Sequence, residues 1–212
     1  MLDVAIFDLD GTLIDTARTS IAAIRDCARR FHFPELADGD VARAIGLPNP
    51  EFYYRLYPDL PRADVAAFGA RVERREAEIT AEIGDSLAFP GIGELLAALH
   101  GRGVALYVAS MGDRMHVDGA LDATGLAKYF DGVYYGDCGK AESLRRILGA
   151  RTNKDFVMVG DTEIDADAAR ANGIPCIGAG YGYCYPERHA AFDKVAGSVD
   201  HLAGMLMRWR IL

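Results

Sequence analysis

The sequence predicts an α/β protein in which a parallel β-sheet lies between two layers of helices and an all-helical segment interrupts the chain after the first strand. From residue 88 onward, short apolar runs alternate with amphipathic stretches, a pattern typical of βαβ units. One further apolar run, Val4–Phe7, stands at the N-terminus, and residues 15–87 carry helical patterns only. We therefore expect residues 1–14 and 88–212 to form a core domain and residues 15–87 an inserted one.

The strands of the core are expected from the apolar runs, and its helices from the amphipathic stretches between them. The run at 104–109 (VALYVA) is apolar throughout, as expected of a strand buried on both faces of a parallel sheet. Strands are predicted over 4–7, 104–109, 132–135, 156–159 and 174–177. Helices of the core are predicted over 91–100, 113–124, 140–148, 164–171 and 199–209.

The inserted segment is expected to be helical throughout. Residues 16–31 place Ile21, Ile24 and Cys27 at the spacing of one helix face. Residues 46–50 contain two prolines within three positions, which predicts a loop there. Helices of this segment are predicted over 16–31, 38–46, 51–57 and 61–82.

Composition and charge argue against several classes of protein. The chain has 212 residues and a net charge of −8, unlike general nucleic-acid binders, which neutralise phosphates with Lys and Arg. No apolar stretch reaches the length of a membrane span, and the N-terminus lacks the pattern of a secretory signal. The four cysteines show no CxxC spacing for a zinc or redox site. We expect a cytoplasmic protein whose partners include neither nucleic acid nor membranes.

The end of the first strand carries the most informative residues. Val4–Phe7 runs directly into residues 8–12 (DLDGT). Asp8 and Asp10 are two residues apart, so in an extended chain both side chains face the same way. Two carboxylates there are unfavourable unless one is protonated or a cation lies between them, and Mg²⁺ is a hard cation that prefers such oxygens. The alternative is a simple Asx-turn, which Asp-Gly favours.

Further polar residues follow the other core strands or begin the next helix. Singly, Ser110 could be a helix cap, Lys140 a solvated residue and Asp165 a surface acid. Ligands of open parallel sheets bind at the carboxyl ends of the strands, so these side chains are expected to converge on a phosphate group beside a divalent metal. The residues concerned are Ser110, Met111, Gly112, Lys140, Asp161 and Asp165.

With these motifs the chain resembles the haloacid dehalogenase-like hydrolase superfamily over essentially its whole length. Residues 8–12 fit the first motif of that family and Ser110 the second. Lys140 fits the third motif, and residues 160–165 (GDTEID) fit the fourth. The resemblance implies a Rossmann-like core in three layers, α/β/α, with residues 15–87 as a helical cap domain. Within the superfamily the chain is most similar to the phosphoglycolate phosphatase and β-phosphoglucomutase branch.

The resemblance also implies roles for individual residues in phosphoryl transfer. Asp8 would be the nucleophile that becomes an aspartyl-phosphate. Asp10 would be protonated when substrate binds, acting first as general acid and then as general base. Lys140 would offset the repulsion between Asp8 and the phosphate. On the substrate side, Thr12 would shape the turn, while phosphate oxygens would be held by Ser110, Met111 and Gly112.

Mg²⁺ is the cofactor that the resemblance implies. Its ligands would be the Asp8 side chain, the Asp10 carbonyl oxygen and Asp161. Asp165 would contact a metal-bound water or Lys140. The ion would neutralise charge on the phosphate oxygens during transfer.

The implied function is a Mg²⁺-dependent phosphatase acting on a small phosphorylated metabolite, of the phosphoglycolate or sugar phosphate type. The alternatives are a β-phosphoglucomutase-like phosphotransferase and a non-catalytic binding protein. Ser20 stands where such mutases typically have a histidine, which weakens the first alternative, and the presence of Asp8 and Asp10 argues against the second. Arg18 and Arg43 either bind a substrate carboxylate or lie on the surface. Either a monomer or a homodimer is compatible with the sequence.

Overall fold

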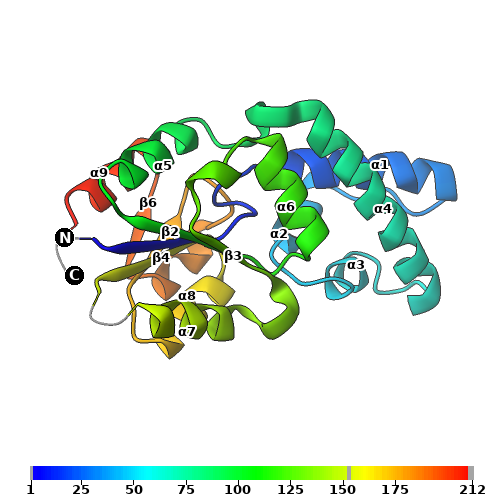
Figure 1. Cartoon of the computed structure of the whole chain (residues 1–212). Coiled ribbons are helices and arrows are strands. Elements are labelled where there is room, and N and C mark those ends of the chain that lie inside the picture. The colour runs from blue at the N-terminus through cyan, green and yellow to red at the C-terminus, as the bar shows by residue number, and fades with distance from the viewer. Residues whose placement is uncertain (1, 152–153, 210–212) are drawn as a thin grey trace.

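The computed structural model describes residues 2–151 and 154–209 and contains one six-stranded parallel sheet (Figure 1). The strand order is β3-β2-β1-β4-β5-β6, so the strand nearest the N-terminus lies in the middle. The bounds are β1 Val4–Phe7, β2 Ala105–Ala109, β3 Gly132–Tyr134, β4 Phe156–Gly160, β5 Cys176–Ala179 and β6 Lys194–Ala196.

The register of the three central strands brings their carboxyl ends to one edge. Phe7, the last residue of β1, lies beside Val108 of β2 and Val159 of β4. The residues that follow these three strands therefore lie next to one another at the carboxyl edge of the sheet. This edge is where ligands of open parallel sheets bind.

Helices cover both faces of the sheet, which gives the three layers that the sequence predicts (Figure 1). Side chains of β1 alternate between two hydrophobic clusters: Ala5 and Phe7 pack into one, Val4 and Ile6 into the other. Helices α5, α6 and α9 contribute to the first cluster, and α7 and α8 to the second. Their bounds are α5 Ile92–His100, α6 Arg114–Ala123, α7 Lys140–Ala150, α8 Glu163–Ala171 and α9 Val199–Met207.

The chain between β1 and α5 is helical, as expected, and has its own hydrophobic cluster, built around side chains such as Tyr53, Val65 and Phe68. Helix α4 of this cap packs against α1 within it and against α6 of the core (Figure 1). The bounds are α1 Ala17–Phe31, α2 Asp38–Ala44, α3 Glu51–Leu56 and α4 Arg62–Ile83. Short 3₁₀ helices lie at Gly84–Leu87, Ala127–Tyr129, Gly136–Cys138 and Pro186–Ala191.

The two connections between core and cap run side by side. The Asp15 N–H donates to the Leu87 carbonyl oxygen at 2.9 Å, and the Phe89 N–H donates to the Leu13 carbonyl oxygen at 3.0 Å. An antiparallel bridge joins Ile14 to Ala88. The domain boundaries at 14/15 and 87/88 stay a prediction, but the chain enters and leaves the helical segment at one place.

Two strands differ from the sequence-based expectation by more than one residue at an end. β6 is not predicted, because three residues that begin with an exposed lysine give no recognisable strand pattern. β5 starts at Cys176 rather than at residue 174 and continues through Gly178 and Ala179. The end of this strand is not recognised in the sequence because Gly and Ala have low β-propensity, whereas bulky β-branched and aromatic residues have high β-propensity. The C-terminal helix α9 ends at Met207, two residues earlier than expected, and Trp209 packs against the core beyond it.

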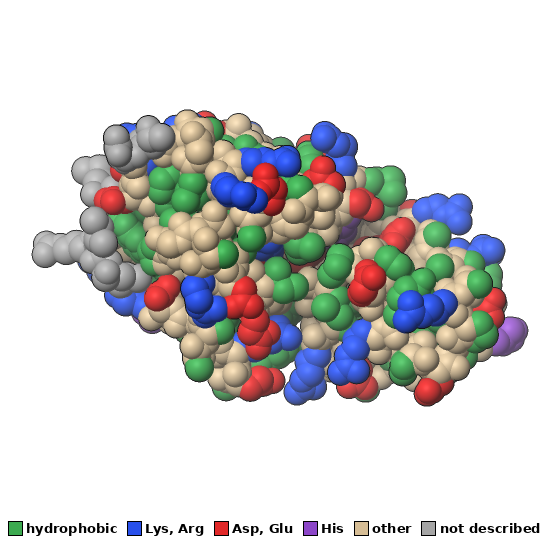
Figure 2. All heavy atoms as spheres, turned by 90° about the horizontal axis from the view of Figure 1, so that it is seen from below, with side chains coloured by type: hydrophobic (Ala, Val, Ile, Leu, Met, Phe, Trp, Pro, Cys, Tyr) green, Lys and Arg blue, Asp and Glu red, His purple; other side chains and the backbone are tan. Residues whose placement is uncertain are grey.

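Charged side chains of both signs are interspersed over the face of the molecule shown in Figure 2. That face carries no broad basic area of the kind that a nucleic-acid backbone would bind. Among the helices within 2–151 and 154–209, none has the length and hydropathy of a membrane span.

Candidate active site

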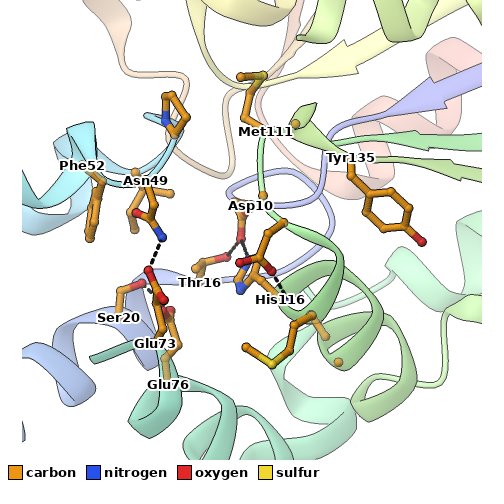
Figure 3. Close-up of a pocket in the computed structure, with 18 of the residues that line it drawn as sticks. Asp10, Thr16, Ser20, Asn49, Phe52, Glu73, Glu76, Met111, His116 and Tyr135 are labelled. Atoms are coloured by element: carbon orange, nitrogen blue, oxygen red, sulfur yellow. Dashed lines mark hydrogen bonds and ion pairs between the residues drawn. The ribbon is translucent and has the colours of Figure 1, made fainter. Parts of the chain in front are cut away.

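A cavity of about 550 Å³ lies between the carboxyl edge of the sheet and the cap. Figure 3 shows it in close-up, with Asp10, Met111 and His116 from the core and Ser20, Asn49 and Glu76 from the cap. Asp8 and Lys140 also line it. The site predicted from strand ends therefore opens into a chamber that the cap helps to form.

Asp8 and Lys140 form a buried ion pair at the floor of this cavity. The Lys140 ammonium lies 2.8 Å from Asp8 Oδ1 and 2.5 Å from Asp165 Oδ1. Asp8 is 3% exposed and Lys140 4%. Burial alone would lower the pKa of Lys140, but the charges of Asp165 and Asp8 outweigh it and raise that pKa. Lys140 therefore stays charged and holds the Asp8 carboxylate in place.

Asp165 is a positioning residue whose two oxygens are both engaged. Oδ1 contacts Lys140, and Oδ2 accepts hydrogen bonds from the Thr162 N–H at 2.9 Å, the Thr162 hydroxyl at 2.8 Å and the Asp161 N–H at 3.2 Å. Thr162 and Asp165 form the capping box that begins α8. Of the two contacts expected for Asp165, the structure shows the one with Lys140. Gly160 is required here because a Cβ would lie 2.2 Å from Asp165 Cγ.

Asp161 has one oxygen that no protein group satisfies. Its Oδ1 accepts a hydrogen bond from the Thr12 hydroxyl at 3.1 Å, whereas Oδ2 is buried without a partner. A Cβ on Gly11, whose φ is +75°, would lie 2.7 Å from that oxygen. A buried oxygen without a partner is unfavourable, so Asp161 Oδ2 is available to a ligand.

The residues present fit a divalent cation. Carboxylate oxygens of Asp8, Asp161 and Asp165 lie within 4.8 Å of one another, and only one lysine opposes them. Burial and the Asp165 charge raise the pKa of Asp8 to about 7 in spite of Lys140. Burial and the Asp8 charge also raise the pKa of Asp161. A hard cation beside the free Asp161 oxygen would offset this excess negative charge.

Asp10 forms a second ion pair, which the sequence analysis missed. Its Oδ1 accepts a hydrogen bond from the Thr16 hydroxyl at 2.5 Å and another from His116 Nε2 at 2.8 Å (Figure 3). Burial would lower the pKa of His116, but the Asp10 carboxylate outweighs it and raises this pKa to about 10. Burial would raise the pKa of Asp10, yet His116 and Thr16 bring it below the ordinary value.

These shifts favour His116 over Asp10 as the proton carrier of the pair in the absence of substrate. That Asp10 is protonated when substrate binds stays a prediction. The signal that could have found His116 is its position one turn into the helix that follows Ser110, at the same sheet edge.

The loop after β2 is shaped by its own hydrogen bonds. Ser110 Oγ accepts a hydrogen bond from the Gly112 N–H at 3.0 Å, while Met111 and Gly112 line the cavity. Asp113, not Ser110, caps α6, since its side chain accepts from the His116 N–H at 2.9 Å. Ser110 thus keeps a hydroxyl at the strand end, 1% exposed, and the helix-cap alternative for Ser110 is wrong. Thr12 is buried against Asp161 and positions that carboxylate.

The structure does not bring the cap arginines to the cavity. Arg18 is exposed, and its guanidinium donates to the Ser86 carbonyl oxygen of the connection back to the core. Arg43 is exposed and lies over the Tyr185 ring. The reason is helical phase: Ser20 points toward the cavity, and Arg18, two residues earlier, lies about 200° away around α1.

Two glutamates of α4 occupy the cap side instead, and the sequence analysis missed both. Glu76 Oε1 accepts hydrogen bonds from the Ser20 hydroxyl at 2.5 Å and the Thr19 hydroxyl at 2.9 Å. Glu73 Oε1 accepts from the Asn49 side-chain amide at 2.8 Å (Figure 3). Positions 73, 76, 77 and 80, all of which line the cavity, repeat at the spacing of one helix face. This spacing could have indicated in the sequence that one face of the helix, which is otherwise rich in exposed charged residues, lies against the site.

Comparison with known proteins places the chain in a family. A model of the haloacid dehalogenase-like hydrolases matches residues 5–179. A phosphoglycolate phosphatase of Cupriavidus necator is 32% identical, over 97% of this chain and 94% of that protein. A 5'-nucleotidase of Pseudomonas aeruginosa is 28% identical, over 84% of this chain and 82% of that protein.

Solved structures agree on the fold. A crystal structure described as a predicted phosphoglycolate phosphatase from Haemophilus somnus has a TM-score of 0.85 at 21% identity and covers 96% of this chain and 97% of its own. The family match and the relatives lead to one conclusion: the chain belongs to the haloacid dehalogenase-like hydrolases, in their phosphoglycolate-phosphatase-like branch, and is an enzyme of the phosphatase type.

Proposed function

We propose that the protein is a Mg²⁺-dependent phosphatase that hydrolyses a small phosphate monoester through an aspartyl-phosphate on Asp8. The observation that carries the proposal is the position of Asp8. Its carboxylate lines the cavity and is paired with Lys140, close to Asp161, which has an unpartnered oxygen. The Asp10–His116 pair lines the same cavity and supplies a proton.

In the first step, an Asp8 oxygen attacks phosphorus and the bond from phosphorus to the ester oxygen breaks. The leaving oxygen takes a proton from the Asp10–His116 pair, where Asp10 is the group that touches substrate and His116 holds the proton in reserve. Lys140 favours the ionised form of Asp8 and orients its carboxylate, so the attacking oxygen is held in position before substrate arrives. Met111 and Gly112, which line the cavity, would face the phosphate, and Ser110 would hold their loop through the hydrogen bond that it accepts from the Gly112 N–H.

In the second step, Asp10 accepts a proton from a water molecule, which attacks phosphorus and breaks the bond to Asp8. Inorganic phosphate leaves, and the Asp8 carboxylate is regenerated with its Lys140 contact. The proton taken from water restores the Asp10–His116 pair. The two steps together consume one water and release one alcohol and one phosphate.

Mg²⁺ would be held by the Asp8 side chain, the Asp10 main-chain carbonyl and Asp161, and when bound it neutralises charge on the phosphate oxygens. Asp165 supports the site through Lys140. The names of the two relatives, phosphoglycolate phosphatase and 5'-nucleotidase, support a phosphate monoester as substrate. The four cysteines are all free, which supports action in the cytoplasm.

The test is phosphate release from a panel of small phosphate monoesters, with Mg²⁺ and with a chelator. We expect release that depends on Mg²⁺ and that Asp8→Asn abolishes. Release that persists at full rate in chelator would contradict the metal requirement. If no phosphate is released from any compound, p-nitrophenyl phosphate included, the phosphatase function is contradicted.

A further inference from the structure

The cap side of the cavity is acidic and polar. Glu73 and Glu76 line the cavity from α4, and Asp113 of the core adds a third carboxylate at the start of α6. In Figure 3 the two glutamates lie beside Ser20 and Asn49, across the cavity from Asp10 and His116. The part of a substrate that extends from the phosphate toward the cap therefore meets carboxylates.

Three cationic residues line the cavity, and each has another partner. Lys140 is held by Asp8 and Asp165, and His116 by Asp10. The Arg114 side chain is 74% exposed, with its guanidinium over the Tyr135 ring at 4.4 Å. Among the described lining residues, no buried cation is free to receive a carboxylate of the substrate, and Arg114 is exposed.

Glu76 is built to accept further hydrogen bonds. The hydroxyl groups of Thr19 and Ser20 both donate hydrogen bonds to Oε1 and orient the carboxylate. The second oxygen, Oε2, accepts no hydrogen bond from the described residues. Burial raises the pKa of Glu76, as it does that of Glu73. An oriented, partly desolvated carboxylate with one free oxygen favours a donor group on its ligand.

Resting on the proposed phosphatase function, we propose that Glu76, assisted by Glu73, selects phosphate monoesters whose alcohol part carries hydrogen-bond donors and no carboxylate. Hydroxyl groups of a polyol and the amino group of an amino alcohol share this chemistry. A substrate carboxylate, as in phosphoglycolate, would face like charges without a free buried cation to compensate them, an arrangement by which binding sites reject wrong partners. The selection thus differs from what the name of the Cupriavidus necator relative suggests.

The experiment measures kcat/KM with Mg²⁺ for glycerol phosphate, a hexose phosphate, a nucleoside monophosphate, phosphoethanolamine and phosphoglycolate. p-Nitrophenyl phosphate, whose alcohol part has neither donors nor a carboxylate, is the reference. The proteins are the wild type, Glu76→Gln and Glu73→Gln. Glu78→Gln is the matched control, because Glu78 lies on the same helix but is exposed and paired with Arg75.

We expect the best donor-bearing substrate to exceed phosphoglycolate by at least about tenfold in kcat/KM for the wild type. Glu76→Gln should reduce that ratio of kcat/KM values, because it removes the charge and keeps the shape, when the kcat/KM of each substrate is taken relative to that of p-nitrophenyl phosphate with the same variant. Glu73→Gln should reduce the ratio of kcat/KM between the best donor-bearing substrate and phosphoglycolate by a smaller factor, and Glu78→Gln should leave this ratio unchanged. If the preferred substrate is the amino alcohol, Glu76→Gln lowers its kcat/KM strongly. A polyol loses less, since the glutamine carbonyl still accepts a hydrogen bond.

Phosphoglycolate as the best substrate of the wild type, with a preference that Glu76→Gln leaves unchanged, would overturn this inference and leave the phosphatase function standing. No hydrolysis of any compound, p-nitrophenyl phosphate included, would overturn the phosphatase function and this inference with it.

Discussion

The two sides of the cavity organise their charges in different ways. On the core side, each carboxylate follows a strand of one parallel sheet and has a defined partner: Asp8 has Lys140, Asp10 has His116 and Asp161 has Thr12. On the cap side, Glu73 and Glu76 come from one face of a helix and line the cavity, and the hydrogen bonds that they accept from the described residues go to Oε1 alone.

This difference assigns separate tasks to the two sides. The core side is held by the register of the sheet and by buried ion pairs, an arrangement that fixes attacking and proton-carrying groups before substrate binds. The cap side offers acceptors that a ligand can satisfy. Changes on the core side should therefore affect the rate with every substrate, and changes on the cap side the choice among substrates.

The largest effect is expected from Asp8→Asn, which removes the proposed nucleophile. Turnover should fall by on the order of 10⁴- to 10⁶-fold with every substrate, as is typical when a covalent nucleophile is lost. Phosphate release by freshly purified protein measures this, with deamidation excluded by mass spectrometry. Wild-type turnover in the variant would contradict the assignment.

Lys140→Ala comes next, because it leaves Asp8 and Asp165 buried without their cation. We expect kcat to fall by about 10²- to 10³-fold and the free energy of unfolding to fall by about 3 kcal/mol. Steady-state kinetics and urea unfolding measure the two. The control is Lys154→Ala, since Lys154 is half exposed and pairs with Asp3 at the surface. A near-normal rate would show that another residue positions Asp8.

His116→Gln tests whether the Asp10–His116 pair protonates the leaving group. The glutamine amide can still donate a hydrogen bond to Asp10 but holds no transferable proton, so kcat for an alkyl phosphate should fall by about 10- to 100-fold. p-Nitrophenyl phosphate should be affected much less, because its leaving group needs little protonation. Equal losses for both substrates would indicate a purely structural role for His116.

Metal binding should stabilise the protein in a pH-dependent way. The folded-state pKa of Asp8 is raised to about 7 and that of Asp161 is raised as well, so ionising these groups destabilises the fold increasingly as pH rises from about 4 to 7. Mg²⁺ needs both groups ionised and relieves their repulsion. We expect the gain in Tm on adding Mg²⁺ to be larger at pH 8 than at pH 5. Asp161→Asn should lose most of it, and an equal gain at both pH values would contradict this account of the site.

The smallest effect is expected from Arg18→Ala. The guanidinium contacts the Ser86 carbonyl and does not line the cavity, so kcat/KM should change by less than about twofold with each monoester, as for most surface substitutions. A large rise in KM confined to phosphoglycolate would show that Arg18 binds the substrate carboxylate. It would contradict the account in which the cap side of the cavity offers acceptors alone.

Most of the fold and the core side of the site could be predicted from the sequence, for a physical reason. The residue that follows a buried strand lies at the carboxyl edge of the sheet. The parallel register of the strands is therefore enough to bring Asp8, Ser110 and Asp161 close together. The strand pattern failed only where strands are short or made of small residues, as in β6 and the end of β5.

Helical residues of the site could not be predicted in the same way. Whether Arg18 or Ser20 points into the cavity depends on the rotation of α1 against α4, which the packing of two helices decides. The pairing of His116 with Asp10 joins residues 106 positions apart through the start of α6. The protonation of that pair follows from the contact, and no spacing in the sequence indicates it.

The two-step transfer through Asp8 is tested most directly by the stereochemistry at phosphorus. A phosphorothioate monoester made chiral with oxygen isotopes is hydrolysed in isotopically labelled water, and the configuration of the thiophosphate product is determined. Attack by Asp8 and then by water inverts phosphorus twice, so we expect net retention of configuration. Net inversion would mean that water attacks the substrate directly, and it would contradict Asp8 as the nucleophile.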